Sequence, residues 1–363
     1  MKCGIVGLPN VGKSTLFNCL SNAKAQSANY PFCTIEPNIG TVSVPDPRLF
    51  KLEKFISPER VVPAVVEIID IAGLVKGASQ GEGLGNQFLA NIRECEAIIH
   101  VLRCFDNGNI VHVEGSIDPI RDKEIIDLEL QLKDMETLSK AIEKAKKNIK
   151  SGKKEDIYAY ETLQRLYLFI EEGKNAREFP VEEGTTAIIS EIALLTLKPV
   201  LYLCNVDEQS IKNGNEWTKK IENIAQKEGA EVLVLAAQTE ADINELETYE
   251  ERQMFLEELG LGEPGVNRLI RKAYRLLKLQ TYFTVGVREV RAWTIKKGWT
   301  APQAAGVIHT DFEKGFIRAE VIRYDDFIAY GSEARVKEAG KLSVEGKEYI
   351  VKDGDIVHFR FNV

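Results

Sequence analysis

The chain has 363 residues, of which 44% are hydrophobic, and its formal net charge at pH 7 is -8. This length can bury at least one full core and favours two or three domains, and the hydrophobic content argues against a disordered chain. The acidic balance excludes a protein whose whole surface binds nucleic acid, because that mode needs an excess of Lys and Arg, although local basic faces are compatible with it.

The cysteines and the N-terminus indicate the cellular compartment. The six cysteines and four histidines form neither a CxxC pair nor a zinc-like cluster, which predicts reduced core thiols rather than disulfides or a zinc site. The N-terminus leads directly into an apolar strand without the features of a signal peptide, and no apolar run reaches about 18 residues. We therefore expect a soluble cytoplasmic protein with no membrane segment.

The first motif is the segment GLPNVGKS at residues 7–14, which lies between an apolar strand at 3–6 and a helical pattern at 13–20. Its glycines let backbone N–H groups surround phosphates, and the following helix adds its positive N-terminal end. We expect Lys13 to reach the β and γ phosphates and Ser14 to give its hydroxyl to Mg²⁺. The loop residues that complete the nucleotide contacts are Asn10, Val11, Gly12 and Thr15.

Two further segments fit a nucleotide switch. A strand at 64–69 ends in the DxxG sequence at 70–73, where Asp70 can hold the Mg²⁺ shell and Gly73 can turn its N–H toward the γ-phosphate. The Pro-bounded loop at 30–37 places Thr34 as a third Mg²⁺ ligand when the γ-phosphate is present, with an ordinary loop threonine as the alternative.

The remaining segments predict an α/β fold with an insertion. Apolar runs at 40–44, 97–102, 199–204 and 231–235 alternate with helical patterns, which favours a mostly parallel, doubly wound sheet. Helical spacing at 127–150 and 157–172 predicts an antiparallel helical hairpin inserted into this sheet domain. From about residue 279, short alternating segments predict a small α+β module.

Four segments carry a family resemblance: GLPNVGKST, NYPFCTIEPN, DIAGLVKGASQGEGLGNQFL and NVDE. Together they resemble the YchF subfamily of Obg-like ATPases, in the P-loop GTPase superfamily, over essentially the whole chain. The resemblance implies a GTPase-like nucleotide-binding domain over 1–118 and 198–278, a helical coiled-coil arm over 119–197, and a C-terminal TGS domain of β-grasp type over 279–363.

The base-reading motif departs from that of GTPases. The usual N-K-x-D sequence is replaced by the four residues at 205–208, in which Asn205 is kept, Val206 replaces Lys and Glu208 stands at the acidic position. Asn205 can pair bidentately with adenine, whereas Glu208 alone would still be compatible with guanine. The resemblance favours ATP, with Val206 and Ala236 contacting the base.

Hydrolysis is expected to be slow. Leu74 stands where Ras-like enzymes place a water-orienting Gln, and the resemblance implies His112 as the catalytic group instead. The alternative for His112 is an ordinary surface loop residue, and its rival, His100, lies in an apolar strand as a satisfied core histidine. Asn10 has two interpretations, a ligand of K⁺ beside the phosphates or a loop-turn residue.

Two basic regions suggest RNA as a partner. One is the tip of the arm, with lysines between 140 and 154, and the other runs from Arg268 to Lys278 and on to the basic and Trp residues of 288–299. Solvated helix faces are the alternative. With the resemblance, these surfaces imply a ribosome-associated ATP-hydrolysing switch; the alternatives are an Obg-type GTPase in ribosome assembly and a nucleotide-gated binding protein with incidental hydrolysis.

Overall fold

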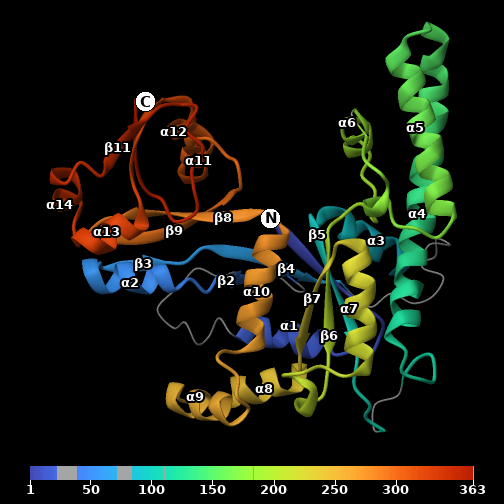
Figure 1. Cartoon of the computed structure of the whole chain (residues 1–363), viewed down its shortest axis with the longest axis horizontal. Coiled ribbons are helices and arrows are strands. Elements are labelled where there is room, and N and C mark those ends of the chain that lie inside the picture. Colours follow the sequence, from blue (N-terminus) through green and yellow to red (C-terminus); the bar gives the residue numbers. More distant parts are fainter. Residues whose placement is uncertain (23–38, 72–83, 109–111, 183, 363) are drawn as a thin grey trace. The chain divides into compact units, whose positions relative to one another are not determined.

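The computed structural model describes residues 1–22, 39–71, 84–108, 112–182 and 184–362 (Figure 1). Among these, the chain separates into two compact units. Unit one comprises 1–22, 39–40 and 68–266, and unit two comprises 41–67 and 267–362. Residues 41–67, which the sequence assigns to the nucleotide-binding domain, therefore group with the C-terminal segment, and the finer boundaries at 118, 198 and 279 remain proposals.

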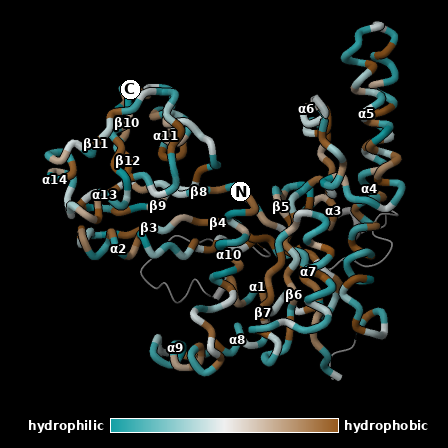
Figure 2. The backbone as a smooth tube through the Cα atoms, viewed as in Figure 1, coloured by the Kyte–Doolittle hydropathy of each residue, from teal (hydrophilic) through white to brown (hydrophobic). Residues whose placement is uncertain are grey.

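Unit one is built on the predicted sheet. The sheet has the strand order β2-β4-β1-β5-β6-β7, in which residues 41–43 of β2 and 65–67 of β4 are grouped with unit two, and the pairs β1–β5, β5–β6 and β6–β7 are parallel. Every residue of β5 and β6 is buried, which is typical of parallel strands covered on both faces, and Figure 2 shows hydrophobic residues concentrated along this sheet. The strand bounds are β1 Lys2–Val6, β2 Ile39–Ser43, β4 Val65–Asp70, β5 Ala97–Arg103, β6 Val200–Asn205 and β7 Glu231–Leu235.

The helices around this sheet start where the sequence supplies caps. Asn215 caps α7 by accepting hydrogen bonds from the N–H groups of Trp217 and Thr218, and Gly229 ends that helix with a positive φ of 66°. The N–H groups of Gly265 and Val266, at the start of α10, donate to the buried Glu240 carboxylate. The helix bounds in unit one are α1 Lys13–Asn22, α3 Leu84–Glu94, α7 Glu216–Glu228, α8 Ala237–Glu245 and α9 Tyr249–Glu258. The helix α10 (Gly265–Leu276) begins in unit one, and its residues 267–276 belong to unit two.

The inserted arm consists of α4 (Pro119–Asn148) and α5 (Lys154–Glu171), which run side by side and are joined by a short turn (Figure 1). The helix α4 begins eight residues before the predicted 127, because Asp118 accepts from the N–H groups of Ile120 and Arg121 and Pro119 suits the first helical position. Leu138 of α4 packs in a core with Leu163, Leu166 and Ile170 of α5, which confirms the helical hairpin. The short helix α6 (Thr185–Ser190) follows.

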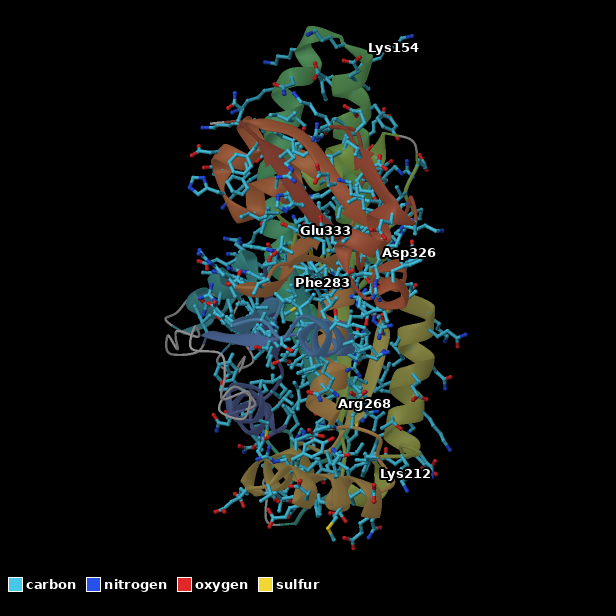
Figure 3. All side chains as sticks on the ribbon, turned by 90° about the vertical axis from the view of Figure 1, so that its left-hand side faces the viewer. Lys154, Lys212, Arg268, Phe283, Asp326 and Glu333 are labelled. Atoms are coloured by element: carbon cyan, nitrogen blue, oxygen red, sulfur yellow. The ribbon has the colours of Figure 1, made fainter. Side chains whose placement is uncertain are left out.

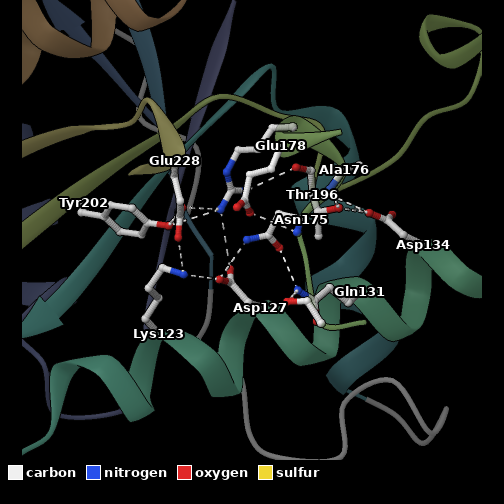
Figure 4. Close-up of polar contacts among 12 residues, drawn as sticks. Lys123, Asp127, Gln131, Asp134, Asn175, Ala176, Glu178, Thr196, Tyr202 and Glu228 are labelled. Carbon is white, nitrogen blue, oxygen red and sulfur yellow. Dashed lines mark hydrogen bonds and ion pairs between the residues drawn. The ribbon is translucent and has the colours of Figure 1, made fainter. Parts of the chain in front are cut away.

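The base of the arm is fixed by buried polar contacts (Figure 4). Asp134 is fully buried, and its carboxylate accepts from the N–H of Leu195 at 2.7 Å and from the N–H and hydroxyl of Thr196 at 2.8 and 2.7 Å. About three turns earlier on α4, Lys123 bridges Asp127 and Glu228 at 2.7 Å each. These bonds join the first half of α4 to the segment that returns to β6 and to the end of α7.

Unit two is an α+β module with a mixed sheet. The strand order is β11-β10-β12-β8-β9-β3, in which β12–β8 and β3–β9 are parallel and the other three pairs are antiparallel. The helix α11 packs three alanines against Tyr282, Phe316 and Phe359 on one sheet face. The elements are α2 Pro47–Ile56, β3 Arg60–Val62, β8 Leu279–Val285, β9 Glu289–Lys296, α11 Ala301–Ile308, α12 Thr310–Lys314, β10 Phe316–Ile322, α13 Tyr324–Tyr330, α14 Glu333–Glu338, β11 Leu342–Glu345 and β12 Ile356–Phe361.

One expectation about unit two is modified, namely that its Trp residues belong to a basic surface. Trp293 and Trp299, which the sequence associates with a basic surface, are partly buried and packed against the core of this module. Trp293 also donates from its indole N–H to Thr284 and lies under the guanidinium of Arg291. These two indoles therefore contribute to the packing of the core.

None of the described helices is long and apolar enough to cross a membrane.

Candidate nucleotide-binding site

The predicted phosphate loop connects β1 to α1, and close backbone approach explains two of its glycines. A Cβ atom at Gly7 would lie 2.5 Å from the carbonyl oxygen of Val101, and one at Gly12 would lie 2.3 Å from the side-chain nitrogen of Asn205. Gly12 also has a φ of 98°, and Asn10 has a φ of 63°, a conformation that Asn tolerates better than most residues. The loop is thus wedged against the carboxyl ends of β5 and β6, where ligands bind in open parallel sheets.

Lys13 begins α1 and folds back over the loop. Its Nζ donates to the carbonyl oxygens of Gly7 at 2.7 Å and Leu8 at 3.1 Å, and only 8% of the residue is exposed. Burial lowers the pKa of Lys13 to about 8, against the opposing attraction of Asp70. The amine is therefore held at the loop, near the carboxylate that the sequence assigns to the metal.

Asp70 ends β4 and has an unsatisfied oxygen. Its Oδ1 is buried and has no hydrogen-bond partner among the described residues. Burial raises the pKa of Asp70, although the nearby Lys13 acts in the opposite direction. A buried carboxylate oxygen without a donor costs free energy, and a bound cation is a natural partner for it.

The oxygen atoms that Ser14 and Asp70 offer suit a hard cation such as Mg²⁺ better than a softer metal. Ser14 exposes its hydroxyl at the first turn of α1, and the described residues contain no cluster of three or more His, Cys, Asp or Glu side chains. A hard cation held by one carboxylate, one hydroxyl and phosphate oxygens needs no such cluster. The other two predicted participants, Thr34 and Gly73, lie outside the described residues, as does Leu74.

A pocket of about 540 Å³ adjoins the loop on the side of β6 and β7. It brings together predicted site residues from three separate segments of the chain. Those that line it are Asn10, Gly12, Thr15, Asn205, Val206, Glu208 and Ala236. Val11 does not line it, because the residue is 1% exposed and its backbone carbonyl accepts a hydrogen bond from Asn205.

Asn205 joins the walls of this pocket. Its Nδ2 donates to the carbonyl oxygen of Val11 at 2.9 Å, and its Oδ1 accepts from the N–H of Ala237 at 2.8 Å. Both atoms are thus already used in holding the phosphate loop to the start of α8. Each atom keeps one further N–H or lone pair beyond these bonds, so the bidentate pairing of Asn205 with adenine stays a prediction.

The rest of the base-reading motif divides into buried and exposed parts. Val206 is 3% exposed and its N–H donates to the carbonyl of Leu235. Asp207 caps a short turn by accepting from the N–H of Ser210 at 2.9 Å, while Glu208 is exposed on the pocket wall. The side chain of Glu208 is therefore positioned at the pocket without a fixed structural role.

One wall of the pocket was missed by sequence reasoning. Phe105, Asp106 and Asn107 follow the carboxyl end of β5 and line the pocket opposite α8. The signal was available, since the residues after a central parallel strand meet the residues after its neighbours at the same edge of the sheet. Phe105 supplies the aromatic surface of this wall.

His112 does not line the pocket in this structure. It is 8% exposed, its Nε2 lies 2.8 Å from Oδ2 of Asp122, and its Nδ1 accepts from the N–H of Glu114 at 3.1 Å. Since Nδ1 is an acceptor, the ring proton lies on Nε2 and is donated to Asp122. The alternative of a surface loop residue is wrong with respect to exposure, because both ring nitrogens are engaged in the interior.

His100 is a core residue, as expected, but it is not satisfied. It is 2% exposed on β5 and its ring lies 5.8 Å from that of Tyr202, while its Nε2 has no hydrogen-bond partner within the described part of the chain. Desolvation by burial lowers the pKa of His100 to about 4. A neutral imidazole in the core is suited to packing rather than to proton transfer at the phosphates.

Comparison with known proteins agrees with this geometry. A family model described as a 50S ribosome-binding GTPase matches residues 2–154, and the model of the YchF GTPase C-terminal region, described as a protein of unknown function, matches residues 279–362. The chain is 56% identical over 362 residues to a "Ribosome-binding ATPase YchF" of Haemophilus ducreyi and 54% identical over 365 residues to the protein of that name in Bacillus subtilis. These alignments cover all of this chain and 99% and 100% of the relatives.

A solved structure extends the match to three dimensions. The Schizosaccharomyces pombe YchF GTPase is 39% identical, with a TM-score of 0.88 over 99% of this chain and 97% of that one. The resemblance seen in the motifs is therefore confirmed along the whole length, and so is the fold class of a P-loop domain with an inserted arm and a C-terminal α+β module. This chain belongs to the YchF family of P-loop GTPase-like proteins.

Proposed function

We propose that this protein binds ATP with Mg²⁺ and hydrolyses it slowly to ADP and phosphate, acting as a nucleotide-dependent switch at the ribosome. The observation that carries the proposal is the junction of the phosphate loop with the pocket behind it, through the two hydrogen bonds of Asn205. Two relatives named ribosome-binding ATPases are identical to this chain at 56% and 54% of the aligned positions, which supports the proposal.

Each residue of the phosphate site has a defined part in this proposal. Lys13 leaves its two loop carbonyls to contact the β and γ phosphates, and the N–H groups of the loop bind the remaining phosphate oxygens. Ser14 and Asp70 hold Mg²⁺, with Thr34 and Gly73 completing the γ-phosphate side. When bound, Mg²⁺ supplies charge neutralisation to the transferred phosphoryl group.

Adenine is the proposed base. Val206 replaces the Lys that packs on guanine in related GTPases, and the exposed Glu208 replaces their Asp. Asn205 shapes the pocket by positioning Val11 and Ala237, and its pairing with adenine belongs to the same proposal. Phe105 and Val206 give the pocket apolar surface for the base.

Slow turnover is expected from the chemistry of Leu74 and from the contacts of His112. Leu74 provides no hydrogen bond to an attacking water, and His112 is held by Asp122 and by the N–H of Glu114. For His112 to act on the nucleotide, its loop must release both contacts. The same restraint favours the second candidate function, a nucleotide-gated binding protein in which hydrolysis is incidental.

The partner and location complete the proposal. A ribosome-associated protein works in the cytoplasm. Lys150, Lys153 and Lys154 are exposed at the tip of the arm, where Figure 3 labels Lys154, and these side chains suit contact with ribosomal RNA. K⁺ beside the phosphates, with Asn10 as a ligand, remains a separate part of the proposal. Asn10 lines the pocket, and a higher turnover in K⁺ than in Na⁺ would support this assignment.

Competition between nucleotides tests the proposal directly. A fluorescent ATP analogue bound with Mg²⁺ should be displaced by ATP at a concentration at least about tenfold lower than GTP, which corresponds to about 1.4 kcal/mol of discrimination. Equal or better displacement by GTP would instead favour the Obg-type GTPase. Co-sedimentation with purified ribosomes, compared between ATP and ADP at two salt concentrations, tests the partner.

A further inference from the structure

The wall of the nucleotide pocket that follows β5 is fixed at its first residue by backbone contacts. The N–H of Cys104 donates to the carbonyl oxygen of Asn205 at 2.8 Å, and the carbonyl oxygen of Cys104 accepts from Nδ2 of Asn215 at 2.7 Å. The next three residues, 105–107, line the pocket. Strand pairing does not hold these three residues, because β5 ends at Arg103.

The side chain of Arg103 contacts this wall from the interior. It is the last residue of β5 and is 1% exposed. Its Nε donates to the carbonyl oxygen of Phe105, and a terminal nitrogen donates to that of Asn107, each at 3.3 Å. The guanidinium carbon lies 4.7 Å from the centroid of the Phe105 ring, within the range of a cation–π contact. One side chain therefore contacts both ends of the wall.

A guanidinium in the interior calls for a physical explanation. Burying a charge costs free energy unless hydrogen bonds or an opposite charge offset the loss of water. Val101 and Leu102 are buried in the same strand without such a cost. The two hydrogen bonds of Arg103 go to carbonyl oxygens two and four residues later in the chain, so they fix the path of the segment that lines the pocket.

The charge of the pocket gives this cation a second effect. Four of the side chains that line the pocket are acidic, and among the described lining residues none is basic. The acidic residues are Asp106, Asp207, Glu208 and Asp242. A nucleotide is itself an anion, so a cation beside the wall reduces the repulsion between them. Charge and loop geometry are therefore two separable ways in which Arg103 can act on the nucleotide.

We propose that Arg103 is a positioning residue for nucleotide binding, which holds Phe105 in place as apolar surface for the base. Its planar group donates to two carbonyl oxygens and contacts the ring at the same time, which a Lys ammonium group cannot do. The proposal deepens the proposed ATP site and rests on it for the identity of the nucleotide.

Steady-state ATP hydrolysis by the full chain with Mg²⁺ separates positioning from a structural role. Arg103→Lys keeps the charge, Arg103→Met keeps only a long apolar chain, and both lose the paired hydrogen bonds and the planar contact with the ring. Each should raise KM for ATP about fivefold to tenfold at unchanged kcat, because KM approximates the dissociation constant when chemistry is slow. A merely destabilised protein would instead show a lower kcat at unchanged KM, since part of the sample is unfolded.

The matched control is Arg291→Lys in unit two. There the guanidinium carbon also lies over an aromatic ring, 3.8 Å from the ring centroid of Trp293, and neither residue lines the nucleotide pocket. This variant loses the same type of contact and should leave both kinetic constants unchanged.

A double-mutant cycle tests whether Arg103 acts through the ring. Phe105→Leu should itself raise KM for ATP, because the aromatic surface of the wall is lost. In the Phe105→Leu background, Arg103→Lys should change KM by less than about twofold, because the ring that it holds is no longer present.

Four results would overturn the proposal. An unchanged KM in Arg103→Lys would mean that the charge alone matters. A fall in kcat at unchanged KM would indicate a structural role or a role in the chemical step. Full additivity with Phe105→Leu would show that Arg103 does not act through the ring. Failure of both Arg103 variants to fold, measured by thermal unfolding, would make Arg103 a residue required by the core.

The choice of nucleotide separates the two proposals. If the unaltered protein binds GTP as well as ATP or better, the proposed preference for ATP fails, and the same measurements with GTP still decide the role of Arg103. If ATP is preferred and KM is unchanged in both Arg103 variants, the proposed function stands and the positioning role fails.

Discussion

Nε2 of His112 lies 2.8 Å from Oδ2 of Asp122, and both side chains are almost completely buried. This contact holds the proposed catalytic group away from the nucleotide pocket. Replacement of His112 should therefore lower kcat, whereas replacement of Asp122 should leave kcat unchanged or raise it. A purely structural His112 would instead show parallel losses of stability in both variants.

The first prediction concerns turnover. His112→Ala should lower kcat by about tenfold or more, within the range of general acid–base effects, while KM for ATP stays the same. Asp122→Asn keeps the shape but weakens the restraint, so kcat should be unchanged or higher. Steady-state phosphate release measures both, with His309→Ala on the surface as the control. A loss of turnover in Asp122→Asn equal to that in His112→Ala would contradict the release of the loop.

The second prediction concerns Asn205 as a brace. Asn205→Ala leaves the carbonyl of Val11 and the N–H of Ala237 unpaired in the interior, which should lower the free energy of unfolding by about 2 kcal/mol. ATP binding should weaken as well, because the loop and α8 lose their connection. Glu208→Ala, on an exposed wall residue, should change ATP binding without changing the unfolding midpoint. Urea unfolding and ATP titration of both variants distinguish the brace from a base contact.

The third prediction concerns pH. The pKa of His100 falls from 6.5 to about 4 on burial, with Asp127, Lys123, Arg177 and Glu228 as the surrounding charged groups. The unfolded chain therefore binds a proton before the folded one, and stability present above about pH 6.5 is lost as the pH falls toward 4. The contribution is up to about 3 kcal/mol. His100→Phe should reduce this dependence, measured as the free energy of unfolding between pH 4 and 7, whereas His309→Phe should not. The same change in unfolding free energy with pH in the unaltered protein and both variants would contradict the role of His100.

Much of the phosphate site could be predicted from sequence because the residues that bind phosphate are close together in the chain. The spacing of Gly7, Gly12 and Lys13 is typical of one backbone conformation, so a phosphate-binding loop could be predicted without knowledge of the fold. The role of Asp70 as a metal ligand could be predicted once a strand was expected to end at this residue. By contrast, the hydrogen bonds of Asn205 could not be predicted, because they depend on the distance between β1 and β6 across the sheet.

The misses share a physical cause, which is that they depend on contacts between distant segments. Phe105 became part of the pocket only once β5 was placed beside β6. Residues 60–62 form a strand only because they pair with β9, and three residues carry too little pattern to predict this. The early start of α4 was different, since Asp118 and Pro119 already signalled it.

The fourth prediction concerns the base of the arm (Figure 4). Asp134→Ala removes three hydrogen bonds and leaves two backbone N–H groups buried without partners, so the free energy of unfolding should fall by about 2 to 4 kcal/mol. Glu136→Ala, on the exposed side of the same helix, should cost less than about 0.5 kcal/mol. ATP affinity should be unchanged in both. A loss of ATP binding in Asp134→Ala at a temperature where it stays folded would show that the arm and the nucleotide site are coupled.

The fifth prediction concerns Asp70, whose carboxylate should lower the stability of the protein alone but contribute to the binding of Mg²⁺ and ATP. Burial of an oxygen without a hydrogen-bond donor among the described residues destabilises the carboxylate in the protein alone, whereas a metal ion would stabilise it. Asp70→Asn removes the charge at nearly constant shape, so thermal unfolding without nucleotide should occur at an equal or higher temperature. The further rise in unfolding temperature that Mg²⁺ and ATP give the unaltered protein should be largely lost, as it should be when EDTA removes the metal. Glu67→Gln, on the preceding half of β4, serves as the matched control and should keep that rise. If Asp70→Asn unfolds earlier without ligand yet retains the full stabilisation by Mg²⁺ and ATP, then Asp70 is a structural carboxylate and the metal is held elsewhere.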